Sequence, residues 1–141
     1  MCIRDRMKVT ICRKAHFNAA HKLYNKNLSM ERNREIFGKC SNENYHGHNY
    51  ELIVKLRGEI DKDTGMVYDL GDLKNIIKTE IEDLLDHKNL NIDIPYFNDI
   101  IPTTENLSVF IWNKLRNAIE LDCEISVILY ETPRNFVEYT G

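Results

Sequence analysis

The chain has 141 residues, which suits one domain with a sizeable hydrophobic core and leaves no room for a second domain. Its net charge of −3 argues against nucleic-acid and anionic-membrane partners, and no apolar run approaches the roughly 20 residues that span a bilayer. Because there is no signal-peptide pattern and no C-x-x-C motif, we expect a protein of the reducing cytoplasm, in which the four cysteines need no disulfides.

The six residues at the amino terminus stand apart from the rest of the sequence. They form a short charged stretch, and a second methionine, Met7, directly precedes the first alternating run. We therefore expect a single domain over residues 7–141, with residues 1–6 as a non-native or disordered extension.

The first regular element is a strand that begins at Lys8. Apolar and polar side chains alternate along it, and the alternation continues through Phe17 and Ala19 to His21. His21 therefore shares a face of the strand with Phe17 and Ala19, whereas His16 points to the opposite face.

A long polar segment separates this strand from the next. Residues 22–45 are rich in asparagine, and we expect a loop with one helical turn around Glu31 to Phe37. A loop of this length in a compact domain is usually functional or mobile, and this one delivers Cys40. The alternating pattern resumes at His46 and predicts a second strand that ends at Glu59.

A helix follows the turn at Asp61 to Gly65. Asp69 and Asp72 resemble a helix-capping pair, and the helix should end near Asp86 and His87. Its apolar stripe consists of Leu73, Ile76, Ile77, Ile81, Leu84 and Leu85.

A second helix and two strands complete the pattern. Residues 89–101 look irregular, and Thr103 or Thr104 caps the second helix. The apolar stripe of this helix consists of Leu107, Phe110, Ile111, Leu115, Ala118 and Ile119. Two further strands are expected over residues 125–130 and 136–139.

The order strand, strand, helix, helix, strand, strand predicts an α+β fold. We expect a four-stranded antiparallel sheet with both helices packed on one face. The other face carries enough apolar side chains that we expect it to be covered by association, with sheets from several subunits closing on each other.

The segment Tyr45 to Tyr50 contains the strongest chemical signal, the pair His46 and His48. Residues two apart on a strand project from the same face, so the two imidazoles can converge on one metal ion. With His21 as a third histidine, zinc is the natural candidate, because three imidazoles with one open position form a catalytic coordination set. On its own, a His-x-His pair is about as often only part of a half-exposed strand.

Six sequence blocks, which run in order from about Met7 to the carboxyl terminus, carry a family resemblance. The blocks are His16 to His21, Gly38 to Cys40, His46 to Tyr50, Leu85 to Leu90, Pro102 to Asn106 and Tyr130 to Thr132. They resemble the 6-pyruvoyl-tetrahydropterin synthase family and its sister branch, the 6-carboxy-tetrahydropterin synthases of the queuosine pathway. The resemblance implies the tunnelling fold, in which trimers close a twelve-stranded barrel and two trimers stack into a homohexamer with active sites shared between neighbouring subunits.

The resemblance also implies a role for each site residue. The implied zinc ligands are His21, His46 and His48. The implied catalytic thiol is Cys40, with a relay through Asp86 and His87. The implied anchor of the pterin ring is Glu131, assisted by Thr103, Thr104 and Glu105. The implied substrate is a pterin triphosphate, 7,8-dihydroneopterin triphosphate, and zinc acts as a Lewis acid on its side chain. Loss of triphosphate and internal redox tautomerisation need no nicotinamide or flavin.

Each of these residues also has a purely structural interpretation. Cys40 can be an inert buried cysteine, and Asp86 and His87 can simply end a helix whose dipole favours a cation. Glu131 can be a charge at the end of a strand. The threonines before the second helix can be an N-cap, which is compatible with a ligand role. A non-enzymatic zinc module, with Cys40 as a fourth protein ligand, is the alternative from another functional class.

The spacing between Cys40 and His46 bears on the product. Five residues, Ser41 to Tyr45, separate them. This length resembles the pyruvoyl branch, whereas three residues are typical of the queuosine branch. The resemblance to the pyruvoyl branch implies 6-pyruvoyl-tetrahydropterin as the product. Spacer length is physically relevant, because it sets where the thiolate lies relative to the substrate carbons. The alternative is 6-carboxy-5,6,7,8-tetrahydropterin with release of acetaldehyde.

Overall fold

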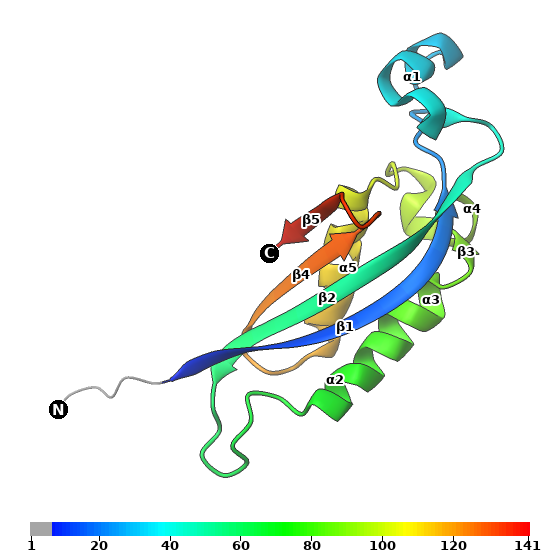
Figure 1. Cartoon of the computed structure of the whole chain (residues 1–141). Coiled ribbons are helices and arrows are strands. Elements are labelled where there is room, and N and C mark those ends of the chain that lie inside the picture. Colours follow the sequence, from blue (N-terminus) through cyan, green and yellow to red (C-terminus); the bar gives the residue numbers. More distant parts are fainter. Residues whose placement is uncertain (1–6) are drawn as a thin grey trace.

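Two long strands form the centre of the structure (Figure 1). The computed structural model describes residues 7–141, so the expectation for residues 1–6 lies outside the described residues. Strand β1 (Lys8–His21) pairs antiparallel with β2 (His46–Glu59) along their whole length, from Lys8 opposite Glu59 to His21 opposite His46. Both strands have the bounds that the alternating pattern predicts.

The sheet contains one strand more than the four expected. Its order is β3-β1-β2-β4-β5, in which β4 (Glu124–Tyr130) and β5 (Phe136–Tyr139) continue the antiparallel part. The additional strand β3 (Lys88–Asn89) pairs parallel with β1. The prediction of a four-stranded antiparallel sheet is therefore wrong, and the described sheet is five-stranded and mixed. Two residues are too few to show a periodicity, so only the tertiary structure places them beside β1.

The two long helices lie where the apolar stripes predict them, on one face of the sheet (Figure 1). The first consists of α2 (Leu70–Ile77), a π-helical turn η2 (Lys78–Glu82) and α3 (Asp83–Leu85). The second is α5 (Thr104–Ala118). Both predicted caps are confirmed: the Asp69 side chain accepts from the Asp72 N–H, and the Thr103 side chain accepts from the Asn106 N–H.

The π-helical turn has a cause in the sequence. The fully buried residues of the first helix, Leu73, Ile77, Ile81 and Leu85, are spaced by four throughout. A regular α-helix has 3.6 residues per turn, so this spacing would rotate the stripe steadily away from the sheet. One wider turn corrects that rotation and keeps all four side chains in the core.

The segments expected to be loops contain more helix than predicted. The polar segment includes α1 (Met30–Phe37), which extends away from the sheet in Figure 1, followed by the 3₁₀ turn η1 (Gly38–Ser41). The segment after β3 includes α4 (Leu90–Asp93) and the 3₁₀ turn η3 (Pro95–Asn98). These short helices carry too few apolar residues for a periodic signal, and side-chain caps such as Ser29 and Asn89 begin α1 and α4.

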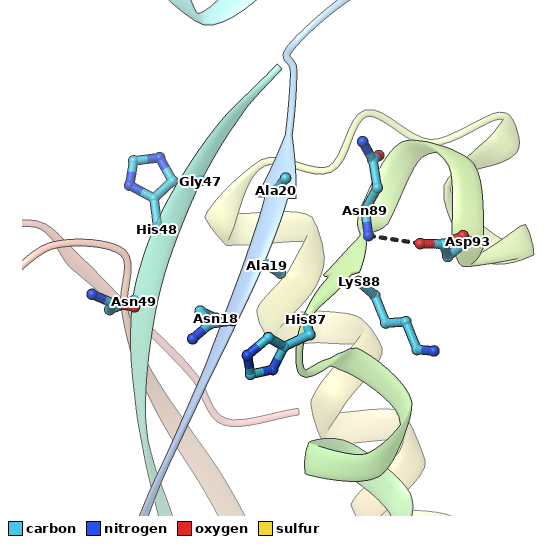
Figure 2. A pocket seen from close by; sticks show the side chains of 10 residues that line it. All are labelled: Asn18, Ala19, Ala20, Gly47, His48, Asn49, His87, Lys88, Asn89 and Asp93. Carbon is cyan, nitrogen blue, oxygen red and sulfur yellow. Dashed lines mark hydrogen bonds between the residues drawn. The ribbon is translucent and has the colours of Figure 1, made fainter. Parts of the chain in front are cut away.

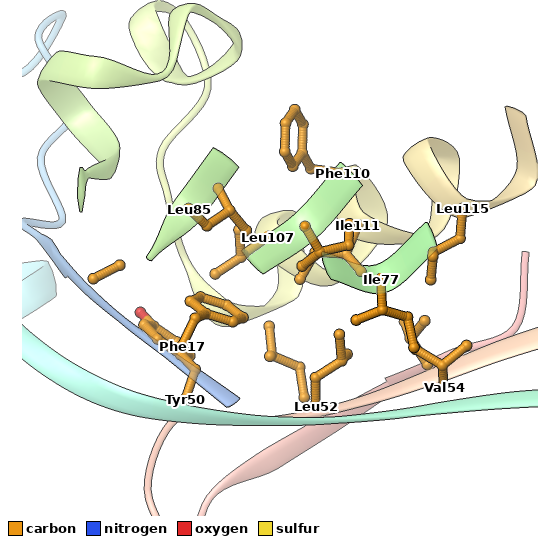
Figure 3. Close-up of a cluster of buried hydrophobic side chains, with 14 of the residues drawn as sticks. Phe17, Tyr50, Leu52, Val54, Ile77, Leu85, Leu107, Phe110, Ile111 and Leu115 are labelled. Atoms are coloured by element: carbon orange, nitrogen blue, oxygen red, sulfur yellow. The ribbon is translucent and has the colours of Figure 1, made fainter. Parts of the chain in front are cut away.

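One hydrophobic core lies between the sheet and the two long helices (Figure 3). The alternate residues of β2 point into it, and Tyr50, Leu52 and Val54 are all fully buried. None of the described helices covers the opposite face of the sheet, where Cys12, His16 and Glu51 are exposed. No helix in the described part of the chain is long and apolar enough to cross a membrane.

Replacing Leu52 with alanine should reduce the free energy of unfolding by about 2–5 kcal/mol. Leu52 is completely buried in the middle of β2, so the truncated side chain leaves a cavity that the surrounding core fills only in part. Urea denaturation followed by circular dichroism measures the change. Leu70, which is 46% exposed, provides the matched control, and its replacement with alanine should cost about 1 kcal/mol or less. Equal losses in the two variants would contradict this account of the core.

Candidate functional site

Three histidines meet at one end of the long strand pair. His21 ends β1, and His46 and His48 begin β2 on the same face. One nitrogen from each ring lies within 4.8 Å of the others, and the three ring centroids are 4.6–5.1 Å apart. The predicted convergence of the three imidazoles is therefore confirmed within one chain.

The ring of His21 is held in one orientation. It is fully buried, and its Nδ1 lies 2.7 Å from the carbonyl oxygen of Pro102. A carbonyl can only accept, so Nδ1 carries the proton and Nε2 presents a lone pair to the histidine cluster. The Tyr50 hydroxyl, 3.4 Å from the same Nδ1, packs beside it. A hydrogen bond from the ring nitrogen that faces away from the metal, here from His21 Nδ1 to the Pro102 carbonyl, is the usual way in which a protein fixes the tautomer of a metal-binding histidine.

The cluster is suited to a divalent cation. The Nε2 atoms of His21 and His48 are buried and have no hydrogen-bond partner among the described residues. Unpaired buried polar atoms are costly, and a metal ion at the point where the rings converge would satisfy them. Burial also lowers the pKa of His21 from 6.5 to about 4 and the pKa of His46 below its usual value. Both shifts keep the imidazoles neutral, which is the form that binds metal.

Glu131 brings a carboxylate to the same cluster from the end of β4. Its Oε2 is 3.8 Å from His21 Nε2 and 3.9 Å from His48 Nε2. Thr104, the first residue of α5, is buried and donates its hydroxyl proton to the same Oε2 at 2.7 Å. The structure thus places Thr104 and Glu131 together at the histidines.

The neighbours of Thr104 lie differently. The Thr103 hydroxyl is occupied as the N-cap of α5. Glu105 is exposed on the first turn of the helix, and its backbone carbonyl accepts from the Ser108 hydroxyl. The capping interpretation of Thr103 is confirmed, and a role for Thr103 or Glu105 toward a ligand stays a prediction.

Cys40 lies near the histidines along the chain but is not one of the clustered ligands. It is half-buried on η1, and its carbonyl oxygen accepts from the Leu23 N–H at 2.7 Å, which ties η1 to the segment just after His21. The group of possible metal-binding atoms found in residues 7–141 comprises the three histidines without Cys40. A closed structural site with Cys40 as the fourth ligand therefore has no support in this arrangement.

Asp86 and His87 form the expected pair at the end of the first helix. Asp86 Oδ2 is 2.9 Å from His87 Nδ1, and the His87 side chain is 77% exposed. Two backbone contacts with Asn18 hold the pair: the Asn18 N–H donates to Asp86 Oδ1, and the His87 N–H donates to the Asn18 carbonyl. The first of these, with a smaller contribution from His87, lowers the pKa of Asp86.

His87 presents its ring from a strained backbone. Its φ of 61° is uncommon for a residue with a side chain. The ring lines a cavity of about 470 Å³ together with Gly47 and Lys88 (Figure 2). Among residues 7–141 no hydrogen bond or ion pair joins Cys40 to Asp86 or His87. The described residues of a single chain therefore bring the three histidines together, but Cys40 makes no such contact with the Asp86–His87 pair.

The sequence patterns did not identify three contributors to the site: the Tyr50 side chain, the Pro102 carbonyl and the Asn18 backbone. Tyr50 follows His48 at the same two-residue spacing, so its position on the histidine face could have been recognised. The Pro102 carbonyl and the Asn18 backbone carry no side-chain signal, and only the packing of distant segments shows their contribution.

Comparisons with known proteins agree with this geometry. The family described as 6-pyruvoyl tetrahydropterin synthase matches residues 10–141. The 6-pyruvoyl tetrahydrobiopterin synthase of Pongo abelii is 48% identical over 96% of this chain and 94% of its own length. The solved structure of the Caenorhabditis elegans 6-pyruvoyl tetrahydropterin synthase superposes with a TM-score of 0.91 at 42% identity, covering 98% of this chain and 99% of that one. The 6-carboxy-5,6,7,8-tetrahydropterin synthase of Haemophilus influenzae is 33% identical over 72% of this chain and 84% of its own length.

Proposed function

This chain belongs to the 6-pyruvoyl tetrahydropterin synthase family, and we propose that it is a zinc-dependent lyase that converts 7,8-dihydroneopterin triphosphate to 6-pyruvoyl-tetrahydropterin with loss of triphosphate. The observation that carries this proposal is the 48% identity, over nearly the whole chain, with a relative that bears the pyruvoyl name. The 6-carboxy relative matches less of the chain at lower identity. The spacer of five residues between Cys40 and His46 supports the same choice.

His21, His46 and His48 are the residues that would hold the zinc ion. Their neutral imidazoles suit zinc, and the Pro102 carbonyl aims the His21 lone pair at the cluster. When bound, zinc supplies Lewis-acid chemistry that acidifies the C–H bonds beside the substrate's side-chain oxygens. The rest of the reaction is substrate binding, proton transfer to and from the side-chain carbons, and elimination of triphosphate, and the proposed groups for the proton transfers are Cys40, Asp86 and His87.

Cys40 is the proposed base. In its thiolate form a cysteine is a general base, so Cys40 would accept protons from the side-chain carbons and return them. Asp86 orients the His87 ring through the 2.9 Å contact, as carboxylates orient imidazoles in other proton relays. For Cys40 to exchange protons with this relay, its thiol must lie close to the His87 ring.

Subunit assembly is the proposed means by which they meet. We place the Cys40 of one subunit opposite the Asp86–His87 pair of its neighbour in a homohexamer, a dimer of trimers. Two features support this arrangement: the exposed His87 ring, and a sheet face that no described helix covers. Closing such sheets into a barrel also removes their exposed edges.

Glu131 is the proposed anchor of the pterin ring. A carboxylate can accept from the 2-amino group and from a ring N–H at the same time, which gives a bidentate contact of fixed geometry. Thr104 already donates to this carboxylate, and Thr103 and Glu105 at the start of α5 would assist.

Product analysis tests the proposal. Anaerobic incubation of the zinc-loaded protein with 7,8-dihydroneopterin triphosphate should yield 6-pyruvoyl-tetrahydropterin and triphosphate by mass spectrometry. Because a displacement of about an ångström changes which bond is placed for cleavage, the same residues could instead release acetaldehyde and a 6-carboxy pterin. That product would overturn the pyruvoyl assignment and leave the metal, Cys40 and Glu131 assignments standing.

A further inference from the structure

The position of Glu131 relative to the histidines needs an explanation beyond ring recognition. Its Oε2 faces the Nε2 atoms of His21 and His48 at nearly equal distances, 3.8 and 3.9 Å. The Nε2 of His21 bears a lone pair because its Nδ1–H is used by Pro102. A carboxylate oxygen and a lone pair repel each other, and neither the His21 Nε2 nor the His48 Nε2 has a hydrogen-bond partner among the described residues. A cation between these atoms removes the conflict.

The distances suit a shared ion. Two ligands of a tetrahedral zinc, each about 2.0–2.1 Å from the metal, lie about 3.4 Å apart. The distances from Glu131 Oε2 to the two Nε2 atoms exceed this ligand–ligand spacing by only about half an ångström. A small rotation of the Glu131 side chain would therefore bring Oε2 to the position of a ligand. Thr104 fixes which oxygen faces the histidines, because its hydroxyl donates to Oε2 at 2.7 Å.

Charge favours the same arrangement. Three neutral imidazoles leave the full double charge of a divalent cation in a site where His21 is completely buried. Isolated charge is costly in such surroundings, and one carboxylate halves it. Cys40, the other candidate for a fourth ligand, lies outside the cluster of converging atoms in residues 7–141.

We infer that Glu131 is the fourth ligand of the cation when no pterin is bound, held in place by Thr104, and that the pterin ring draws the carboxylate away and opens the position to the substrate. The inference rests on the metal site of the proposed function. The carboxylate cannot bind the cation and hydrogen-bond to the pterin ring at the same time. Binding of the ring therefore opens the fourth coordination position of the cation. Small anions that lack a pterin ring are thereby kept from the cation.

Cobalt substitution provides a test that does not depend on turnover. Co²⁺ reports its ligands through visible absorption bands, and azide serves as a probe for an available coordination position. The variants are Glu131→Ala and Thr104→Val, and the matched control is Glu124→Ala, which removes an exposed glutamate at the other end of β4. Each protein is loaded with Co²⁺ without substrate and titrated with azide.

Glu131→Ala should bind Co²⁺ at least about tenfold more weakly, show shifted visible bands and bind azide at least about tenfold more tightly than wild type. Thr104→Val should shift the same quantities in the same direction by a smaller factor, and Glu124→Ala should match wild type. Unchanged bands and unchanged azide affinity in Glu131→Ala would overturn the inference. Weaker Co²⁺ binding alone would not rescue it, because removal of a nearby negative charge that is not a ligand would also weaken Co²⁺ binding. Wild-type protein that binds no Co²⁺ would overturn the metal site itself, and this inference with it.

Discussion

Replacing Cys40 with alanine should lower turnover of 7,8-dihydroneopterin triphosphate by at least about 10²- to 10⁴-fold, the usual contribution of a positioned acid or base. Zinc content and oligomeric state should stay as in wild type, because Cys40 is a half-buried residue of η1 and lies outside the histidine cluster. Steady-state kinetics, metal analysis and light scattering measure the three quantities. Cys12→Ala is the matched control, since Cys12 lies on β1 on the sheet face opposite the histidine cluster and should be dispensable for turnover.

Mixed assemblies extend this experiment to the proposed sharing of the site between subunits. A Cys40→Ala subunit and a His87→Ala subunit each carry one intact half of the relay. If neighbouring subunits complete each other's sites, a refolded mixture should regain a substantial part of the activity that either variant lacks alone. A Cys40→Ala protein with wild-type rates would instead move the role of base to His87 or another group.

Replacing His48 with alanine should abolish stoichiometric zinc binding. One of three converging imidazoles is then missing, and His21 and His46, even with the Glu131 carboxylate beside them, make a weaker site than the complete cluster. Turnover should fall with the zinc content, and metal analysis after dialysis against a weak chelator measures the loss.

The control for this variant is His16→Ala. His16 is exposed on the opposite face of β1, so its removal should leave the zinc content at the wild-type level. Full zinc retention in His48→Ala would refute the assignment of the metal ligands. Equal loss in both variants would point to a general effect on folding.

Much of the fold follows from local patterns. Alternation along β1 and β2 and the apolar stripes of the two long helices predict these elements with nearly correct bounds, because side-chain direction repeats every 2 residues in a strand and every 3.6 in a helix. The short elements have no such repeat. The parallel pairing of β3, the short helix α4 and the 3₁₀ turn η3 arise from caps and backbone contacts, which the periodicity of apolar side chains cannot reveal.

The candidate site divides in the same way. Strand alternation predicted the face that each histidine shares, His46 with His48 on one strand and His21 with Phe17 and Ala19 on the other, and the family resemblance joined the three into one set of ligands. The structure adds the register that places His21 opposite His46. Only the tertiary structure decided the surroundings of that cluster: the Pro102 carbonyl on His21 Nδ1, and Glu131, which accepts from Thr104, beside the Nε2 atoms of His21 and His48. The Thr104–Glu131 and His21–Pro102 contacts join residues 27 and 81 positions apart in the chain, and such pairings depend on how whole elements pack, which no local pattern of side chains encodes.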